Sequence, residues 1–135
     1  QGIGSVIKHH SPKTKIIGVS AKNSGALSAS LKLGKVCETT HLDTLADGCA
    51  GGIDEDTLTL PLAKAVIDSV IDCTEEQIIE AIKILAWHEN LLVEGSAALA
   101  LAGFLQDKNS EKQKVSLVLL CGGNFDKDLL LPILN

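Results

Sequence analysis

Four consecutive residues near the end of the chain, Cys121-Gly122-Gly123-Asn124, combine a thiol with a glycine turn. They follow the apolar run over residues 115–120, which is typical of a strand buried on both faces of a parallel sheet. Ligands of open α/β sheets bind beyond the carboxyl ends of such strands, and glycines there let a flat ligand approach the backbone. The pattern therefore places Cys121 in a candidate ligand site. A small buried cysteine followed by a plain turn is the alternative.

A carboxylate, Glu94, ends a second apolar stretch, and a helix of small residues is predicted to begin there. An exposed acidic group in the first turn of a helix gains about 0.3–1 kcal/mol from the helix dipole, which would explain Glu94 without any function. The small residues after it predict that another element packs very closely against this helix.

The segment over residues 37–59, which includes Asp47-Gly48, is rich in turn formers and lacks periodicity. An irregular segment of this length in a compact domain is usually functional or disordered. Its many small residues favour a functional loop over a plain surface excursion.

The remaining pattern predicts the elements that position these groups. Thr74 and Gln77 have the spacing of a capping box, which begins the clearest helix of the chain. The alternation of strands and helices predicts an α/β fold with an open, mostly parallel sheet flanked by helices. Strands are expected at 15–19, 69–73 and 115–121. Helices are expected at 2–10, 27–33 and 60–67, from Thr74 through an apolar stripe that ends at Ala86, from Glu94 through small residues to Ala102, and from 126 onward.

Composition limits the possible functions. A chain of 135 residues with 45% hydrophobic residues is sufficient for one globular unit. A net charge of −5 and few aromatic side chains argue against nucleic-acid binding, and the chain lacks the ~20-residue apolar run that crosses a membrane. The four cysteines show no paired spacing and no secretory signal precedes them, which favours reduced thiols in the cytoplasm. Because the chain begins with Gln1 and contains no methionine, we expect a piece of a longer protein.

Several motifs occur together in a recognisable order. They resemble the C-terminal part of the catalytic domain of the threonine/serine dehydratase and serine racemase family of pyridoxal-phosphate enzymes. The motifs are Ile-Ile-Gly-Val at 16–19, Thr-Leu-Ala-Asp-Gly at 44–48, Thr-x-Thr-Leu-Pro-Leu at 57–62, Val-Ile-Asp at 66–68, Thr-Glu-Glu at 74–76, Val-Glu-Gly-Ser-Ala-Ala at 93–98, and Cys-Gly-Gly-Asn at 121–124.

The resemblance implies a fold and a cofactor site. Residues 1–135 would form one portion of a fold type II (tryptophan synthase beta-like) catalytic domain. Cys121 would contact the pyridine nitrogen of pyridoxal phosphate, Glu94 would lie beside the ring, and Gly48 would approach cofactor and substrate through its backbone. Gly122 and Asn124 belong to the same cofactor motif. A thiol is a neutral partner that does not force a proton onto the ring nitrogen, which suits expulsion of a β-hydroxyl group better than persistence of a carbanion.

The resemblance also implies what this chain lacks. None of its lysines matches the Schiff-base lysine of the family, so we expect the fragment alone to be inactive. The complete enzyme, a lyase, would convert a hydroxy amino acid to a 2-oxo acid and ammonia, and would be a homo-oligomer. The cation site of the family uses carboxylates where this chain has Ser20, Ser24 and Ala26, so we expect no metal site.

Three alternatives stay open at this point. Amino-acid racemisation uses the same scaffold, although Cys121 and the missing cation carboxylates argue against it. A non-catalytic assembly or regulatory fragment would explain the absent lysine. A nucleotide-binding half-domain lacks the glycine fingerprint after a strand. Removal of the partner half of a sheet would expose a strand edge, so self-association of the fragment is also expected.

Overall fold

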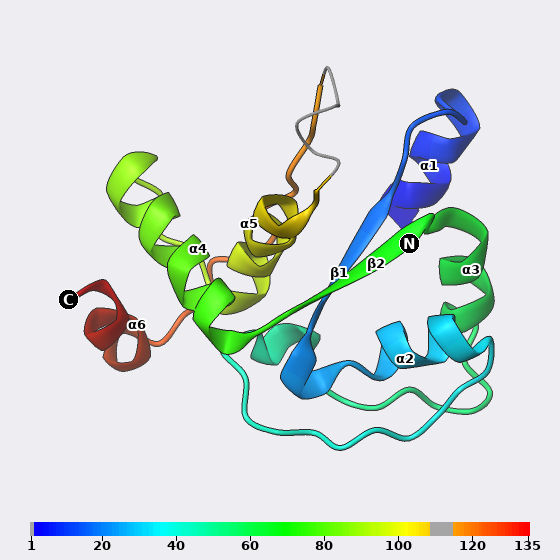
Figure 1. Ribbon diagram of the computed structural model, residues 1–135, viewed down its shortest axis with the longest axis horizontal. Helices are drawn as coiled ribbons and strands as arrows, with labels where there is room; N and C mark the ends of the chain where they lie inside the picture. Colours follow the sequence, from blue (N-terminus) through cyan, green and yellow to red (C-terminus); the bar gives the residue numbers. More distant parts are fainter. Residues whose placement is uncertain (1, 109–114) are drawn as a thin grey trace.

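The computed structural model describes residues 2–108 and 115–135 (Figure 1). None of the helices in this described part combines the length and the hydrophobicity that a membrane span requires. The elements in chain order are α1 (Gly2–His10), β1 (Ile17–Ala21), η1 (Lys22–Ser24), α2 (Ala26–Leu33), η2 (Asp47–Cys49), α3 (Thr59–Val66), β2 (Ser69–Cys73), α4 (Glu75–His88), α5 (Gly95–Gln106) and α6 (Lys127–Leu134).

The sheet of the described residues consists of β1 and β2, which pair in parallel from Ile17 opposite Ser69 to Ala21 opposite Cys73. The second strand has the predicted bounds, whereas the first spans Ile17–Ala21 rather than residues 15–19. Before it, Asp68 binds the backbone of Ile16 twice: its Oδ2 accepts from Ile16 N at 2.7 Å and its own N–H donates to Ile16 O at 2.8 Å. Asp68 therefore holds Ile16 with one backbone and one side-chain hydrogen bond just before the paired strands begin.

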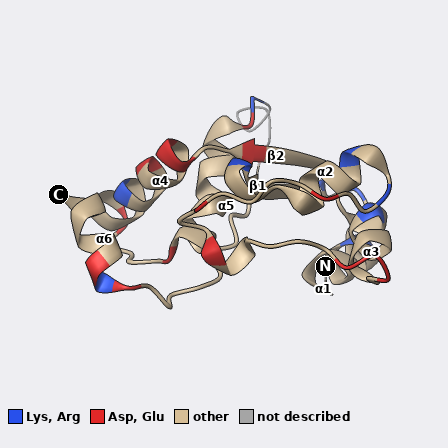
Figure 2. Cartoon of the chain, turned by 90° about the horizontal axis from the view of Figure 1, so that it is seen from below, with Lys and Arg blue, Asp and Glu red and all other residues tan. Residues whose placement is uncertain are grey.

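Helices cover both faces of this sheet (Figures 1 and 2). Ala21 of β1 belongs to the cluster formed with α4 and α5 and Val19 packs against it, whereas Gly18 and Ser20 line the cavity beside α2, which Val19 also reaches. This alternation is the period of two expected of a strand. The prediction of a parallel sheet flanked by helices is confirmed.

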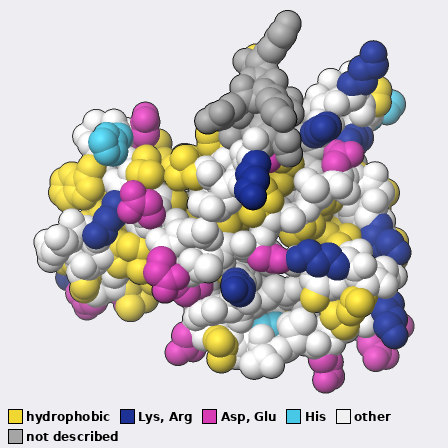
Figure 3. Space-filling model, in the orientation of Figure 1, with side chains coloured by type: hydrophobic (Ala, Val, Ile, Leu, Met, Phe, Trp, Pro, Cys, Tyr) yellow, Lys and Arg dark blue, Asp and Glu magenta, His cyan; other side chains and the backbone are white. Residues whose placement is uncertain are grey.

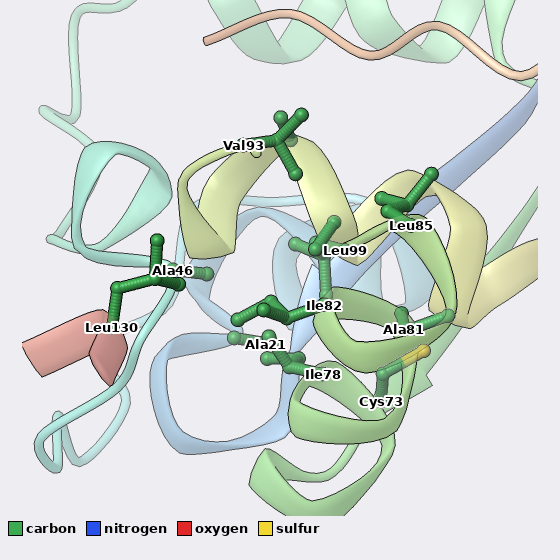
Figure 4. Close-up of a cluster of buried hydrophobic side chains, with 13 residues drawn as sticks. Ala21, Ala46, Cys73, Ile78, Ala81, Ile82, Leu85, Val93, Leu99 and Leu130 are labelled. Carbon is green, nitrogen blue, oxygen red and sulfur yellow. The ribbon is translucent and has the colours of Figure 1, made fainter. Parts of the chain in front are cut away.

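The main hydrophobic core lies between the sheet, α4 and α5 (Figure 4). The capping box is confirmed, because Thr74 Oγ1 accepts from Gln77 N while Gln77 Oε1 accepts from Thr74 N at 2.9 Å. The α4 residues in this core are Ile78, Ala81, Ile82 and Leu85. Leu130 of α6 packs into the same cluster.

The small residues of α5 allow close packing, as the sequence predicts. A Cβ atom on Gly103 would lie 2.4 Å from Val19 Cγ2 of the sheet. A Cβ atom on Gly95 would lie 2.0 Å from the carbonyl oxygen of Leu45. Only glycine fits at these two positions, so α5 is fixed closely against both β1 and the loop that contains Leu45.

The predicted buried strand over residues 115–121 is wrong for this chain. The segment is extended but pairs with neither strand, and the side chains of Val115 and Leu117 are 89% and 82% exposed. Leu120 alone of these packs against the core cluster. Apolar composition favours a strand but cannot supply the neighbouring backbone that a strand needs for hydrogen bonding.

Hydrophobic side chains also gather on the face that carries α4 and α6 (Figure 3).

The close packing of α5 predicts the effect of Gly103→Ala. The added methyl group would collide with Val19, so we expect a loss of about 1–3 kcal/mol in the free energy of unfolding, offset in part by the better helix propensity of alanine. Urea unfolding measures this loss. Gly2→Ala, where a Cβ atom would meet nothing within 4 Å, is the matched control and should be neutral or slightly stabilising. A Gly103→Ala protein as stable as the wild type would contradict the packing.

The environment of Asp68 predicts a pH dependence. A hydrogen bond from Lys8 and one from the Ile16 backbone lower the pKa of Asp68 below its ordinary value of 3.8. The stabilisation from this carboxylate is therefore present above that ordinary pKa and is lost as the pH falls through the lowered one. The difference in urea midpoint between wild type and Asp68→Asn should be largest near neutral pH and shrink in strong acid. A pH-independent difference would show that the charge of Asp68 contributes nothing.

Candidate functional site

Glu94 is the centre of the candidate site. It occupies the N-cap position of α5, yet its side chain makes no capping hydrogen bond to that helix. Its Oε2 atom instead accepts a hydrogen bond of 2.9 Å from the backbone N–H of Asn124. The carboxylate therefore connects the start of α5 to the glycine turn, two segments that are 30 residues apart in sequence.

Two glycines approach the same carboxylate. A Cβ atom on Gly122 would lie 2.3 Å from Glu94 Oε1, and Gly122 has a φ of +137°, which side chains rarely tolerate. A Cβ atom on Gly48 would lie 3.4 Å from Glu94 Oε1. The structure thus brings together Gly48, Glu94, Gly122 and Asn124, which the sequence predicted as site residues.

Cys121 lies directly before Gly122, and its free thiol belongs to an exposed residue. The sequence placed this cysteine at the end of a buried strand, whereas the structure places it at the end of an extended segment. Cys121 is therefore next in sequence to a residue of the Glu94 cluster. The role predicted for this thiol stays a prediction.

Ser96 is a site residue that the sequence analysis missed. Its Oγ atom is buried and has no hydrogen-bond partner among the described residues. The same atom lies close to the loop, because a Cβ atom on Gly48 would be 2.9 Å from it. A buried hydroxyl group without a partner costs about 1–3 kcal/mol. Such an atom beside Glu94 points to a ligand group or a water molecule that would complete its hydrogen bonding. A serine in a run of alanines gives no signal of this in the sequence.

Of the residues at the cation-site positions, Ser24 has other hydrogen-bond partners. Ser24 Oγ lies 2.8 Å from His41 Nδ1 and accepts from Gly51 N at 3.0 Å. Ser20 lines a cavity of about 350 Å³ beside α2. Within residues 2–108 and 115–135, no group of three or more histidine, cysteine or acidic side chains is arranged to hold a metal ion. The expectation that no metal binds here stays a prediction.

Comparison with known proteins identifies the family. Residues 1–122 match the family described as pyridoxal-phosphate dependent enzyme. The chain is 34% identical over 134 residues to the L-threonine ammonia-lyase of Thermotoga maritima, which covers 99% of this chain and 33% of that protein. It is 29% identical to a putative threonine dehydratase of Sinorhizobium fredii, covering 99% of this chain and 41% of that protein. The chain thus spans about a third to two fifths of the length of these relatives.

Solved structures agree with this match. A maize serine racemase superposes with a TM-score of 0.85 at 25% identity, covering 97% of this chain and 41% of that one. The processed form of threonine deaminase isoform 2 from Solanum lycopersicum superposes with a TM-score of 0.82 at 27% identity, covering 98% and 39% respectively.

The burial of the cysteines predicts their order of reaction. Exposed Cys49 and Cys121 should be alkylated by iodoacetamide near pH 8, whereas Cys73 should stay unmodified in the native protein. Cys73 is fully buried, and burial, with a smaller contribution from Asp72, raises the pKa of its thiol to about 11. Peptide mass spectrometry before and after unfolding in urea measures this. Equal labelling of Cys73 and Cys121 in the native protein would contradict the burial.

Proposed function

Because the chain belongs to the family of pyridoxal-phosphate dependent enzymes, we propose that it forms one part of a threonine or serine dehydratase. In the whole protein, the α-proton and the β-hydroxyl group of the amino acid would be lost as water, and hydrolysis of the C–N bond would give a 2-oxo acid and ammonia. The ammonia-lyase and dehydratase names of the relatives support this substrate class. The observation that carries the proposal is the cluster of Gly48, Glu94, Gly122 and Asn124 around one carboxylate.

The residues of this cluster fit the cofactor. Gly48 and Gly122 let the backbone lie directly against Ser96 and Glu94, where side chains would collide, and a Cβ atom on the adjacent Gly123 would meet nothing within 4 Å, so the backbone there is open. A flat aromatic ring needs this kind of open backbone surface. The buried, unpartnered Ser96 hydroxyl supplies a hydrogen-bonding group that the protein itself does not satisfy.

Each residue has a distinct proposed role. Pyridoxal phosphate, when bound, withdraws electrons from the α-carbon of the amino acid. The Cys121 thiol would contact the ring nitrogen as a neutral partner. It would therefore not favour protonation of that nitrogen, as a carboxylate would. Glu94, held in place by the hydrogen bond from Asn124 N–H, would lie beside the ring. The backbone near Gly48 would form one side of the site.

Other features of the whole protein also belong to the proposal. The relatives are longer than this chain, and we infer that the Schiff-base lysine comes from a segment that this chain does not include. The free cysteines support a cytoplasmic location. A homo-oligomer remains the expected assembly.

Amino-acid racemisation is the second candidate, because the maize serine racemase superposes on almost the whole chain. Product analysis separates the two reactions. A dehydratase releases a 2-oxo acid and ammonia, whereas a racemase converts one enantiomer of serine to the other.

The proposal predicts the behaviour of the full-length protein. Added pyridoxal phosphate should give the visible absorbance of a lysine-bound cofactor, and threonine or serine should change that absorbance and yield a keto acid. Cys121→Ser should retain activity, whereas Cys121→Ala should lower kcat/KM about tenfold or less, the value of one hydrogen bond. Absence of cofactor absorbance in a protein that contains the upstream part of the domain would contradict the dehydratase and favour a non-catalytic role.

A further inference from the structure

Glu75, in the first turn of α4, binds a loop rather than its own helix. Its Oε1 atom accepts a hydrogen bond of 2.6 Å from Thr44 Oγ1, and its Oε2 atom accepts one of 2.8 Å from Leu45 N. Both carboxylate oxygens are therefore used, and both partners belong to the segment directly before Asp47-Gly48. Neither partner is close in sequence, because the contacts span 31 and 30 residues.

Thr44 extends this network into the loop. Its Oγ1 atom donates to Glu75 and also accepts a hydrogen bond of 3.1 Å from Ala46 N. The hydroxyl group therefore stabilises a turn of the backbone over residues 44–46, and the Glu75 carboxylate holds this turn through two further hydrogen bonds. Hydrogen bonds to a charged group are about twice as strong as neutral ones. These contacts define one conformation for the chain that enters η2.

The same loop contacts the candidate site through its backbone. The Leu45 carbonyl oxygen packs against Gly95 at the start of α5, where no Cβ atom fits, and Ala46 is fully buried. Gly48 then lies beside Glu94 and Ser96. A displacement of the loop away from Glu75 would therefore move the Gly48 backbone relative to Glu94.

We propose that Glu75 is a positioning residue that, through Thr44 and Leu45, holds the Gly48 backbone in place as one wall of the cofactor and substrate site. The inference rests on the proposed function, because it assigns that wall to pyridoxal phosphate and the amino acid. Glu75 itself touches neither. The capping box at Thr74 places Glu75 at the start of α4, directly after the carboxyl end of β2.

The test compares variants of the full-length protein. Glu75→Gln replaces one acceptor oxygen with a donor that opposes either the Thr44 hydroxyl or the Leu45 N–H, and Thr44→Val removes the hydroxyl while keeping the shape. Each should weaken the Kd for pyridoxal phosphate, measured by absorbance titration, by about tenfold, the value of one charged hydrogen bond. KM for the amino acid should rise as well. Thr44→Ser retains the hydroxyl group and should restore wild-type affinity.

Two controls separate positioning from general stability. Glu80→Gln removes an equal charge from an exposed position of the same helix and should leave the Kd unchanged. Asp68→Asn destabilises the fold at the start of the sheet, where Asp68 contacts Lys8 and the Ile16 backbone, and should lower the Tm without changing the Kd. Amide hydrogen exchange of Leu45 should accelerate in Glu75→Gln and not in Glu80→Gln.

The outcomes distinguish the two proposals. Wild-type protein that does not bind pyridoxal phosphate overturns the proposed function and this inference together. Wild-type protein that binds it, with Glu75→Gln binding equally well, overturns this inference and leaves the proposed function standing. A Kd that changes in Glu75→Gln only as much as in an Asp68→Asn protein of the same Tm also overturns it, because the role of Glu75 would then be stability alone.

Discussion

The close contact between α5 and its neighbours is the constraint on which the candidate site depends. Gly103 lets the helix lie against Val19 of the sheet, and Gly95 lets its first turn lie against the Leu45 carbonyl group. These two contacts fix both the axis and the N-terminus of α5, and the N-terminus carries Glu94. Because the helix cannot shift without a collision, the carboxylate has a defined position to which the glycine turn and the loop at Gly48 can be matched.

The candidate site lies near the carboxyl end of β2, where α4 begins. The carboxyl end of β2 leads directly into Thr74 and α4, whose first turn supplies Glu75 to the loop before Gly48. Ligands of open α/β sheets bind beyond the carboxyl ends of the strands, and the candidate site is formed by loops and helix starts in that region. The core between the sheet, α4 and α5 therefore serves both stability and the placement of the site.

Sequence patterns predicted the local elements well, because their signals are local. The capping box at Thr74 and the small residues of α5 each act through neighbours in sequence or through a simple steric limit. The strand over residues 115–121 was wrong, because pairing depends on which backbone lies alongside and not on composition. Ser96 and Glu75 were missed for a related reason: their importance comes from contacts with the distant loop around Gly48. Family resemblance supplied the grouping of Gly48, Glu94, Gly122 and Asn124, and the geometry shows that these residues meet.

The most direct test of the central claim is the crystal structure of the full-length protein with pyridoxal phosphate bound. We expect the ring to lie beside Glu94 and the Gly48 backbone, with the Cys121 sulfur at hydrogen-bond distance from the ring nitrogen. A ring bound elsewhere, with the Cys121 thiol in solvent and the Ser96 hydroxyl still without a partner, would contradict it. The Glu94 cluster would then be a structural junction between α5 and the glycine turn.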